Sequence, residues 1–235
     1  MGERAHGPVR RGEGTGPGAF TPDGNAVELY SRLPAGTEPE TIAQAVPPGA
    51  SILELGAGAG RVTHALLERG YRVVAVDESE EMLSQVKGAR TVHSSIEALD
   101  LGERFDAVLL ASHLLNTAEP SSRDAMLRSC RRHVADDGKV LVERQGDDWF
   151  GPRMAMTPAD RTRTGIGMRV VSVERSAPGV SDVRIEYEAD GVRWTHSFRA
   201  WDVPDAELER ILTAAGLRLA RYLTDDHSWV EAVPV

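Results

Sequence analysis

The chain has 235 residues, and its 36 acidic and 27 basic side chains give a net charge of −9. This length is enough for one well-buried domain, and an acidic surface repels phosphate backbones, so we expect no nucleic-acid partner. One cysteine excludes an internal disulfide and suits a reducing cytoplasm, and no apolar run approaches the roughly 20 residues of a membrane span. We therefore expect a cytoplasmic protein with no membrane partner.

The chain opens with a segment that predicts a disordered tail. Residues 1–19 contain six glycines, three arginines and almost no apolar side chains, so they cannot bury a core. We expect residues 20–235 to form the folded domain. Its first elements are a short helix within residues 23–33 and a second helix over 37–46, which a capping box and an early proline indicate.

From Ser51 onwards, strands alternate with helices. Apolar runs predict strands at residues 51–55, 73–76, 90–93, 105–111 and 139–143. Helical spacing and end signals predict helices over residues 60–69, 79–87 and 121–134. Cys130 lies on the apolar stripe of the third of these helices, where we expect a core thiol. Strands joined by helical crossovers predict a parallel sheet with helices on both faces.

The pattern changes after Gln145. An irregular stretch is followed by extended segments at residues 168–175, 183–189 and 192–200, the last two joined by the hairpin signal Asp190-Gly191. These segments alternate apolar and charged residues, so one face is wet. We expect residues 146–200 to form a β-rich insert that caps the acceptor pocket. A helix that ends at Gly216 and two further strands then close the chain.

The most informative stretch is a glycine loop with the sequence Glu54-Leu55-Gly56-Ala57-Gly58-Ala59-Gly60-Arg61, between a strand and a helix. Glycines there let the backbone take positive φ and approach a ligand closely. Three details favour S-adenosylmethionine over a dinucleotide. Arg61 stands where the dinucleotide pattern needs a small residue, Glu54 suits an ammonium-bearing ligand, and Asp77 can accept both ribose hydroxyls. A glycine turn in another kind of α/β protein stays open as an alternative.

The loop and its acid resemble the first two motifs of class I S-adenosylmethionine-dependent methyltransferases, in their small-molecule branch. The resemblance covers residues 50–145 and 204–235. It implies an α/β, Rossmann-like sheet of seven mostly parallel strands in the order 3-2-1-4-5-7-6, with strand seven antiparallel. It also implies methyl transfer to N or O of a small molecule, with S-adenosylhomocysteine as product. Two alternative functions stay open, a non-catalytic S-adenosylmethionine-binding protein and a dinucleotide-dependent oxidoreductase. Assembly into a homodimer also stays open.

The resemblance also implies which residues lie at the cofactor. They are Tyr30, Glu54, Gly56, Ala57, Gly58, Gly60, Asp77, Glu78, Met82, Ser95, Ile96, Ala111 and His113. One position departs from the family, because Ser95 stands where an acidic residue usually accepts from the adenine amino group. A neutral hydroxyl is a weaker acceptor than a carboxylate, although the backbone at Ile96 can still meet the ring.

The acceptor side is expected around the end of the fourth strand. His113 and Asn116 follow this strand, and we expect them to be the catalytic residues. Histidine titrates near neutrality and can act as a general base, while a role in ordering the loop stays open. We expect Arg144, Trp149 and Trp201 to bind the acceptor, with a solvated arginine and core tryptophans as the alternatives. No histidine spacing fits a metal site, so we expect no metal.

Overall fold

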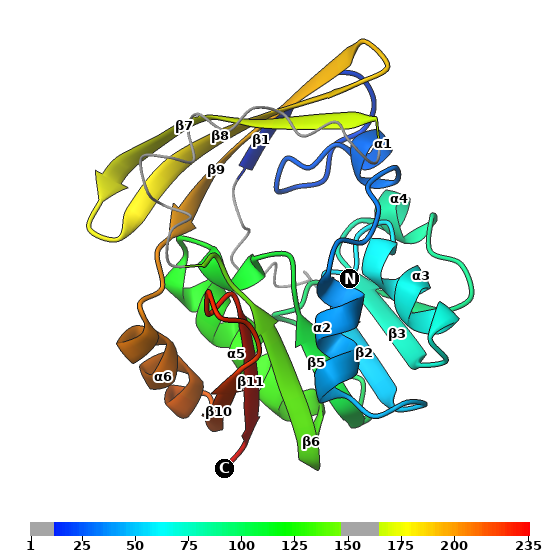
Figure 1. Cartoon of the computed structure of the whole chain (residues 1–235), viewed down its shortest axis with the longest axis vertical. Coiled ribbons are helices and arrows are strands. Elements are labelled where there is room, and N and C mark those ends of the chain that lie inside the picture. Colours follow the sequence, from blue (N-terminus) through cyan, green and yellow to red (C-terminus); the bar gives the residue numbers. More distant parts are fainter. Residues whose placement is uncertain (1–11, 147–164) are drawn as a thin grey trace, which may run out of the picture.

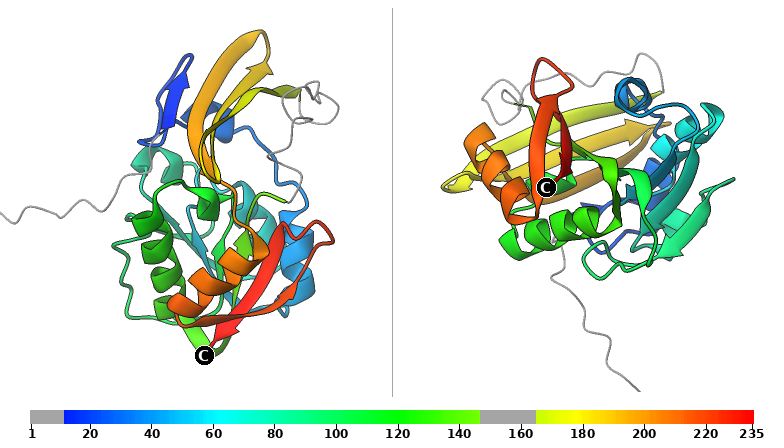
Figure 2. Two further views of the ribbon diagram at one scale, coloured as in Figure 1. Left: turned by 90° about the vertical axis from the view of Figure 1, so that its left-hand side faces the viewer. Right: turned by 90° about the horizontal axis from the view of Figure 1, so that it is seen from below.

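The computed structural model describes residues 12–146 and 165–235. It contains a seven-stranded sheet and a four-stranded sheet. Figure 1 shows the smaller sheet lying across one end of the larger, and the left view of Figure 2 shows the same arrangement from the side. No helix in the described ranges is long and apolar enough to cross a membrane.

The larger sheet has the topology that the sequence predicts. Its strands are β2 (Ser51–Leu55), β3 (Arg72–Asp77), β4 (Arg90–His93), β5 (Phe105–Leu110), β6 (Val134–Glu143), β10 (Leu217–Tyr222) and β11 (Trp229–Pro234). Along the sheet they follow the order β4-β3-β2-β5-β6-β11-β10, with β11 antiparallel to both of its neighbours. The expected order 3-2-1-4-5-7-6 is confirmed. The central strands are near-continuous apolar runs because helices bury both faces of this sheet.

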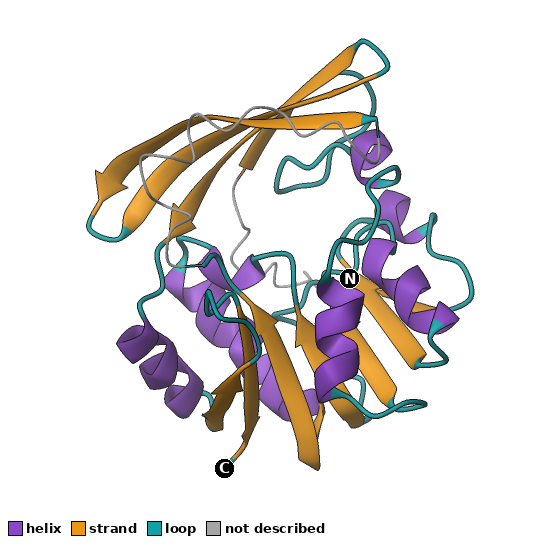
Figure 3. Cartoon of the chain, in the orientation of Figure 1, coloured by secondary structure: helices purple, strands orange, loops and turns teal. Residues whose placement is uncertain are grey.

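Helices cover both faces of the larger sheet (Figure 3). On one face, α2 (Glu38–Ala45) and α3 (Arg61–Glu68) bury their apolar stripes in one core cluster. On the other face, α5 (Pro120–His133) and α6 (Asp205–Ala214) pack in a second cluster. Cys130 is fully buried in that cluster, as expected, and burial raises the pKa of its thiol to about 12.

Of three shorter helical elements, the first packs in the core of the smaller sheet, and the other two follow the carboxyl ends of β3 and β5. They are α1 (Val27–Tyr30), α4 (Glu80–Leu83) and the 3-10 helix η1 (Leu114–Asn116). Ser79 caps the N-terminus of α4, because its hydroxyl accepts the N–H of Met82 at 3.2 Å. Serine is one of the residues preferred at this position.

The smaller sheet has the order β1-β9-β8-β7. It consists of β1 (Gly12–Thr15), β7 (Ile166–Ala177), β8 (Val180–Ala189) and β9 (Val192–Trp201). Asp190 and Gly191 have φ angles of 51° and 76°, as a tight two-residue hairpin turn requires. Ile185 and Tyr187 are buried on one face, whereas Glu186 on the other face pairs with Arg169 of β7. The apolar face is turned towards the larger sheet.

The N-terminal segment differs from the expected disordered tail. Residues 12–15 form β1, with Gly12 opposite Phe198 and Thr15 opposite Thr195 of β9. A Cβ on Gly14 would collide with the ring of Phe20. The glycines are therefore needed for close packing here, and a high glycine content does not indicate disorder in residues 12–15. Residues 1–11 lie outside the described residues.

The helix expected within residues 23–33 is also shorter than predicted. Only α1 is helical, because the preceding residues form a hydrogen-bonded turn. The Thr21 hydroxyl donates to Asp23 and accepts the N–H of Asn25 at 2.9 Å. Such side chain to backbone bonds compete with helix formation.

Candidate active site

A cavity of about 670 Å³ lies between the two sheets. Its floor consists of residues that follow β2, β3, β5 and β6, and its roof is the apolar face of β7, β8 and β9. Residues between β1 and α2 form a third wall. The volume falls within the range of about 300–1,000 Å³ for small-molecule sites. The cavity lies where the strand order reverses beside β2, which is the usual ligand position in open α/β sheets.

The glycine loop lines the floor. Gly56, Gly58 and Gly60 have φ angles of 72°, 56° and 84°, all in the left-handed region. Gly58 lines the cavity, and a Cβ built on it would have no protein atom within 4 Å apart from those of its chain neighbours. A side chain at this position would therefore occupy open space in the cavity. The loop is a cradle that fits close approach of a ligand to the backbone.

Asp77 lies at the end of β3, beside the loop. Its Oδ2 accepts the Gly58 N–H at 2.8 Å, and its Oδ1 accepts the Ser79 N–H at 2.9 Å. A carboxylate oxygen has two lone pairs, so these bonds leave room for ligand hydroxyl groups. Glu78, Met82 and Ala57 also line this part of the cavity, and Tyr30 lines it from the third wall.

Glu54 lies beneath the loop and does not line the cavity. Its side chain is 3% exposed, and its Oε2 accepts the Thr63 hydroxyl at 2.5 Å. Burial raises the pKa of the Glu54 carboxyl to about 7. Direct contact with a ligand was expected for this residue, but the geometry assigns it to support of the loop from below.

Four other expected cofactor residues are not on the cavity wall, and one of them is Gly60, which lies against His64 and Val86. Ile96 and Ala111 are buried, and Cδ1 of Ile96 lies 3.7 Å from a Cβ built on Gly56. The hydroxyl of Ser95 accepts the Ala98 N–H at 3.4 Å. Contacts of Ser95 and Ile96 with an adenine ring stay predictions.

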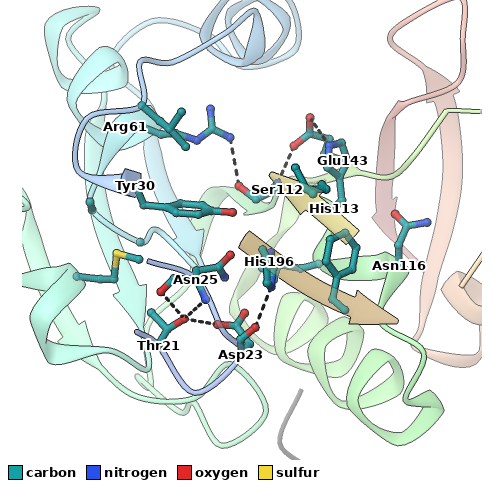
Figure 4. Close-up of a pocket in the computed structure, with 18 of the residues that line it drawn as sticks. Thr21, Asp23, Asn25, Tyr30, Arg61, Ser112, His113, Asn116, Glu143 and His196 are labelled. Carbon is teal, nitrogen blue, oxygen red and sulfur yellow. Dashed lines mark hydrogen bonds and ion pairs between the residues drawn. The ribbon is translucent and has the colours of Figure 1, made fainter. Parts of the chain in front are cut away.

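His113 and Glu143 form the polar part of the floor (Figure 4). Ser112 and His113 have φ angles of 55° and 58°, a conformation that costs energy for residues with a side chain. Glu143 stabilises this turn, because its Oε2 accepts the Ser112 N–H at 2.6 Å. Its Oε1 lies 3.9 Å from Nε2 of His113. The strained turn thus brings an imidazole and a carboxylate together in the cavity.

Asn116 lines the cavity, but its amide is engaged on both sides. Nδ2 donates to the carbonyl oxygen of Trp201 at 2.9 Å, and Oδ1 accepts the Gln145 N–H at 2.8 Å. These bonds tie η1 to the ends of β6 and β9. The expected catalytic role is therefore not supported, and we assign Asn116 to positioning.

Arg144 and Trp201 lie away from the cavity, so the expected acceptor contacts are wrong. Arg144 is 1% exposed and donates to the carbonyl oxygens of His227 and Val203. Trp201 stacks on Arg123, whose guanidinium carbon lies 3.6 Å from the ring centroid. Side chains alternate along an extended chain, so Arg144 points away from the cavity that its neighbour Glu143 lines. Trp149 lies outside the described residues.

Apart from Tyr30, sequence reasoning missed the wall between β1 and α2. This wall includes Thr21, Asp23, Asn25, Leu33, Pro34 and Glu38. Nε2 of His196, on the roof, lies 3.0 Å from the Asp23 carbonyl oxygen, which holds the wall against β9. Tyr30 lies close to Tyr187, and burial followed by the interactions with Tyr187 raises the pKa of Tyr30 well above its usual value. No local pattern indicates that this segment folds against a distant strand.

Sequence reasoning also left out most roof residues as individual contacts. They are Ile166, Met168, Val170, Ile185, Tyr187, Phe198 and Ala200. The alternation along β8 carried the signal, since it predicts one apolar face over a pocket.

Comparison with known proteins places this geometry in context. Residues 52–138 match the family model described as a methyltransferase domain. An uncharacterized methyltransferase of Mycobacterium tuberculosis (strain H37Rv) is 42% identical over 94 residues, which are 37% of this chain and 39% of that protein. The match thus spans about two fifths of that relative's length.

A second relative matches over most of the chain. YqeM of Bacillus subtilis (strain 168), which is named as a methyltransferase, is 33% identical over 220 residues, 84% of this chain and 85% of that protein. Among solved structures, the sugar N-methyltransferase KedS8 from Streptoalloteichus sp. ATCC 53650 has a TM-score of 0.65 and 21% identity over 99% of both chains. This last similarity establishes a shared fold.

Proposed function

The chain belongs to the class I S-adenosylmethionine-dependent methyltransferase family, and we propose that it methylates a nitrogen or oxygen atom of a small molecule. The observation that carries the proposal is a single cavity with two kinds of wall. The glycine loop and Asp77 line one part of the floor and His113 another part, while apolar side chains form the roof. A donor and an acceptor can therefore meet inside one enclosed site.

The floor fits the cofactor of this family. The open space at Gly58 admits a ligand against the backbone, and Asp77 can accept the ribose hydroxyls. Glu78 and Met82 would lie at the adenine edge. When bound, S-adenosylmethionine supplies a methyl group on a sulfonium, with a neutral leaving group.

The acceptor would lie between this floor and the roof. Met168, Val170 and Phe198 provide apolar contacts, and the polar residues of the floor lie opposite them. Holding the acceptor in line with the sulfonium contributes much of the rate, because positioning alone lowers the barrier of a bimolecular reaction. The roof would also limit access of water.

His113 would take the proton that the acceptor loses. The acceptor N–H or O–H proton moves to Nε2, and the carboxylate of Glu143, 3.9 Å away, stabilises the imidazolium. The bond from Ser112 to Glu143 keeps the pair in place. This gives His113 the role of general base and Glu143 that of its positioning partner.

An amine acceptor is favoured over a hydroxyl by the charge of the cavity. Of the described lining residues, Asp23, Glu38, Asp77, Glu78 and Glu143 are acidic, while Arg61 and Arg199 are basic. A negative cleft attracts a protonated amine, which must then lose its proton before methylation. The fold shared with KedS8, itself a sugar N-methyltransferase, also supports nitrogen.

The proposal is tested by measuring S-adenosylhomocysteine formation with pools of small amines and small alcohols. We expect product above the acceptor-free blank with at least one pool of amines. His113→Ala should lower kcat by about 100-fold or more, the usual contribution of a general base, with unchanged S-adenosylhomocysteine affinity. Tight cofactor binding with no turnover on any pool would instead indicate a non-catalytic binding protein.

A further inference from the structure

We propose that Arg61 and Glu38 form a charged clamp for the amino-acid end of the cofactor. The inference rests on the proposed function, since it takes S-adenosylmethionine to lie on the floor of the cavity. It assigns a binding role to two residues that the glycine motif itself does not include. It also predicts which part of the ligand they recognise.

Both side chains line the cavity at the end of the glycine loop. Arg61 is the first residue of α3 and directly follows Gly60. Its Nη1 donates to Oε1 of Glu38, and its Nη2 lies 3.3 Å from the hydroxyl of Ser112 (Figure 4). Glu38, the first residue of α2, is 8% exposed. The pair therefore spans the cavity wall between the cofactor loop and the N-terminal segment.

Stability alone does not explain a buried ion pair at this place. The desolvation of two charges offsets most of their attraction, so buried pairs add little net stability. The two helices are already joined by a second, more exposed pair between Arg69 and Glu40. A functional use of the buried pair accounts better for its position on a ligand cavity.

Glu38 also has an unused acceptor. Its Oε2 is buried and has no partner with good hydrogen-bond geometry among the described residues, although the backbone N–H groups of Gly36 and Glu38 lie near the carboxylate. Buried polar atoms are normally paired, so an unpaired oxygen on a cavity wall indicates a missing donor. Burial raises the pKa of Glu38, but the charge of Arg61, its hydrogen bond and the nearby backbone N–H groups of Glu38 and Gly36 together outweigh this effect, and the net shift is downward. The group is thus a carboxylate at neutral pH.

The pair is complementary to an α-amino acid. Such a group carries an ammonium and a carboxylate on neighbouring atoms, in fixed proximity. A guanidinium binds a carboxylate through two parallel N–H donors, and the free oxygen of Glu38 can accept from the ammonium. The start of α3 adds a favourable field for the anionic half. Ligands that lack the amino-acid end would gain nothing from the clamp.

Calorimetry with two ligands tests the proposal, because 5′-methylthioadenosine lacks the amino-acid end of S-adenosylhomocysteine but keeps the nucleoside. Arg61→Ala should weaken S-adenosylhomocysteine binding by about tenfold to hundredfold, the effect of losing charged hydrogen bonds. Binding of 5′-methylthioadenosine should change by less than about threefold. Arg69→Ala is the matched control, since it breaks the other ion pair between the same helices. It should alter neither affinity.

Further measurements keep the test decisive. If Arg61→Ala fails to fold, Glu38→Gln takes its place in the test, because it preserves the size of the side chain. It should also weaken the binding of S-adenosylhomocysteine and leave the binding of 5′-methylthioadenosine unchanged. Decarboxylated S-adenosylmethionine isolates the role of Arg61, because the wild type should prefer the intact molecule and Arg61→Ala should not. An equal loss of both calorimetry ligands, or no loss of either, would overturn the clamp. Wild-type protein that binds neither ligand would overturn the cofactor site itself.

Discussion

The carboxylate of Asp77 accepts the N–H of Gly58 at 2.8 Å, so the acid at the end of β3 is fixed against the middle of the glycine loop. Asp77 ends β3 and Gly58 lies in the loop after β2, and these neighbouring parallel strands end at the same edge of the sheet. One hydrogen bond therefore couples the shape of the loop to the position of the acid. A substitution at either residue is expected to disturb the same ligand.

Asp77→Ala should weaken S-adenosylmethionine binding by about 2–4 kcal/mol, because charge-assisted bonds to two hydroxyl groups are lost. Asp77→Asn, which can still accept the Gly58 N–H, should lose less. Calorimetry on both variants checks this, with circular dichroism to confirm folding. Wild-type affinity in folded Asp77→Ala protein would remove the residue from the site.

Gly58→Val should abolish cofactor binding, since its side chain would occupy open space in the cavity and a β-branched residue resists positive φ. Gly70→Val is a matched control. Gly70 also has a left-handed φ, 83°, and open space around it, but it does not line the cavity. Both variants should lose stability in urea denaturation, and only the first should lose binding. Normal binding by folded Gly58→Val would show that the loop is not the cradle.

Phe198→Ala should raise the acceptor KM while S-adenosylhomocysteine affinity stays within about tenfold, or roughly 1.4 kcal/mol. The reason is that Phe198 lines the roof on β9 of the smaller sheet, whereas the glycine loop follows β2 of the larger sheet. Trp201→Ala on the same strand is the control, because that ring packs on Arg123 outside the cavity. It should lower the denaturation midpoint and leave acceptor KM unchanged. The reverse pattern in the two variants would place the acceptor elsewhere.

Glu54 predicts a specific dependence of stability on pH. Its folded-state pKa of about 7 lies above the ordinary value of 4.5, so the native state holds the proton more tightly than the unfolded chain. The stabilisation is complete below pH 4.5 and is lost as the pH rises through 7, by at most about 3 kcal/mol. In Glu54→Gln this loss should be absent. Urea unfolding of both proteins at pH 5 and pH 8 measures this loss. An equal change in the free energy of unfolding between the two pH values in both proteins would contradict the burial effect.

The sequence alone was sufficient for the larger sheet because its signals are local. The apolar run at residues 73–76 and the glycine loop each identify their element within a few residues. The position of Asp77 beside the loop also followed, since parallel strands end at one edge.

The acceptor side was less predictable, for two different reasons. Glu143 lines the cavity and Arg144 points away from it, as the alternation of side chains along an extended chain implies when it is continued past the end of β6. The place of Arg144 could therefore have been predicted. The pairing of β1 with β9 could not have been predicted, because Gly12 and Phe198 are far apart in the sequence and glycine-rich segments carry no strand signal.

The pairing of β1 with β9 has a consequence for how the molecule assembles. The strands of the cofactor floor, β2 to β6, are contiguous in the chain, so their contacts can form early. The edge of the roof closes only when the first described strand meets one near the end of the chain, and such long-range contacts form slowly. Substitutions in β1, such as Gly14→Val, should therefore speed unfolding and leave the folding rate nearly unchanged. Stopped-flow fluorescence would show this, and the acceptor side of the cavity would be the last part of the protein to acquire its shape.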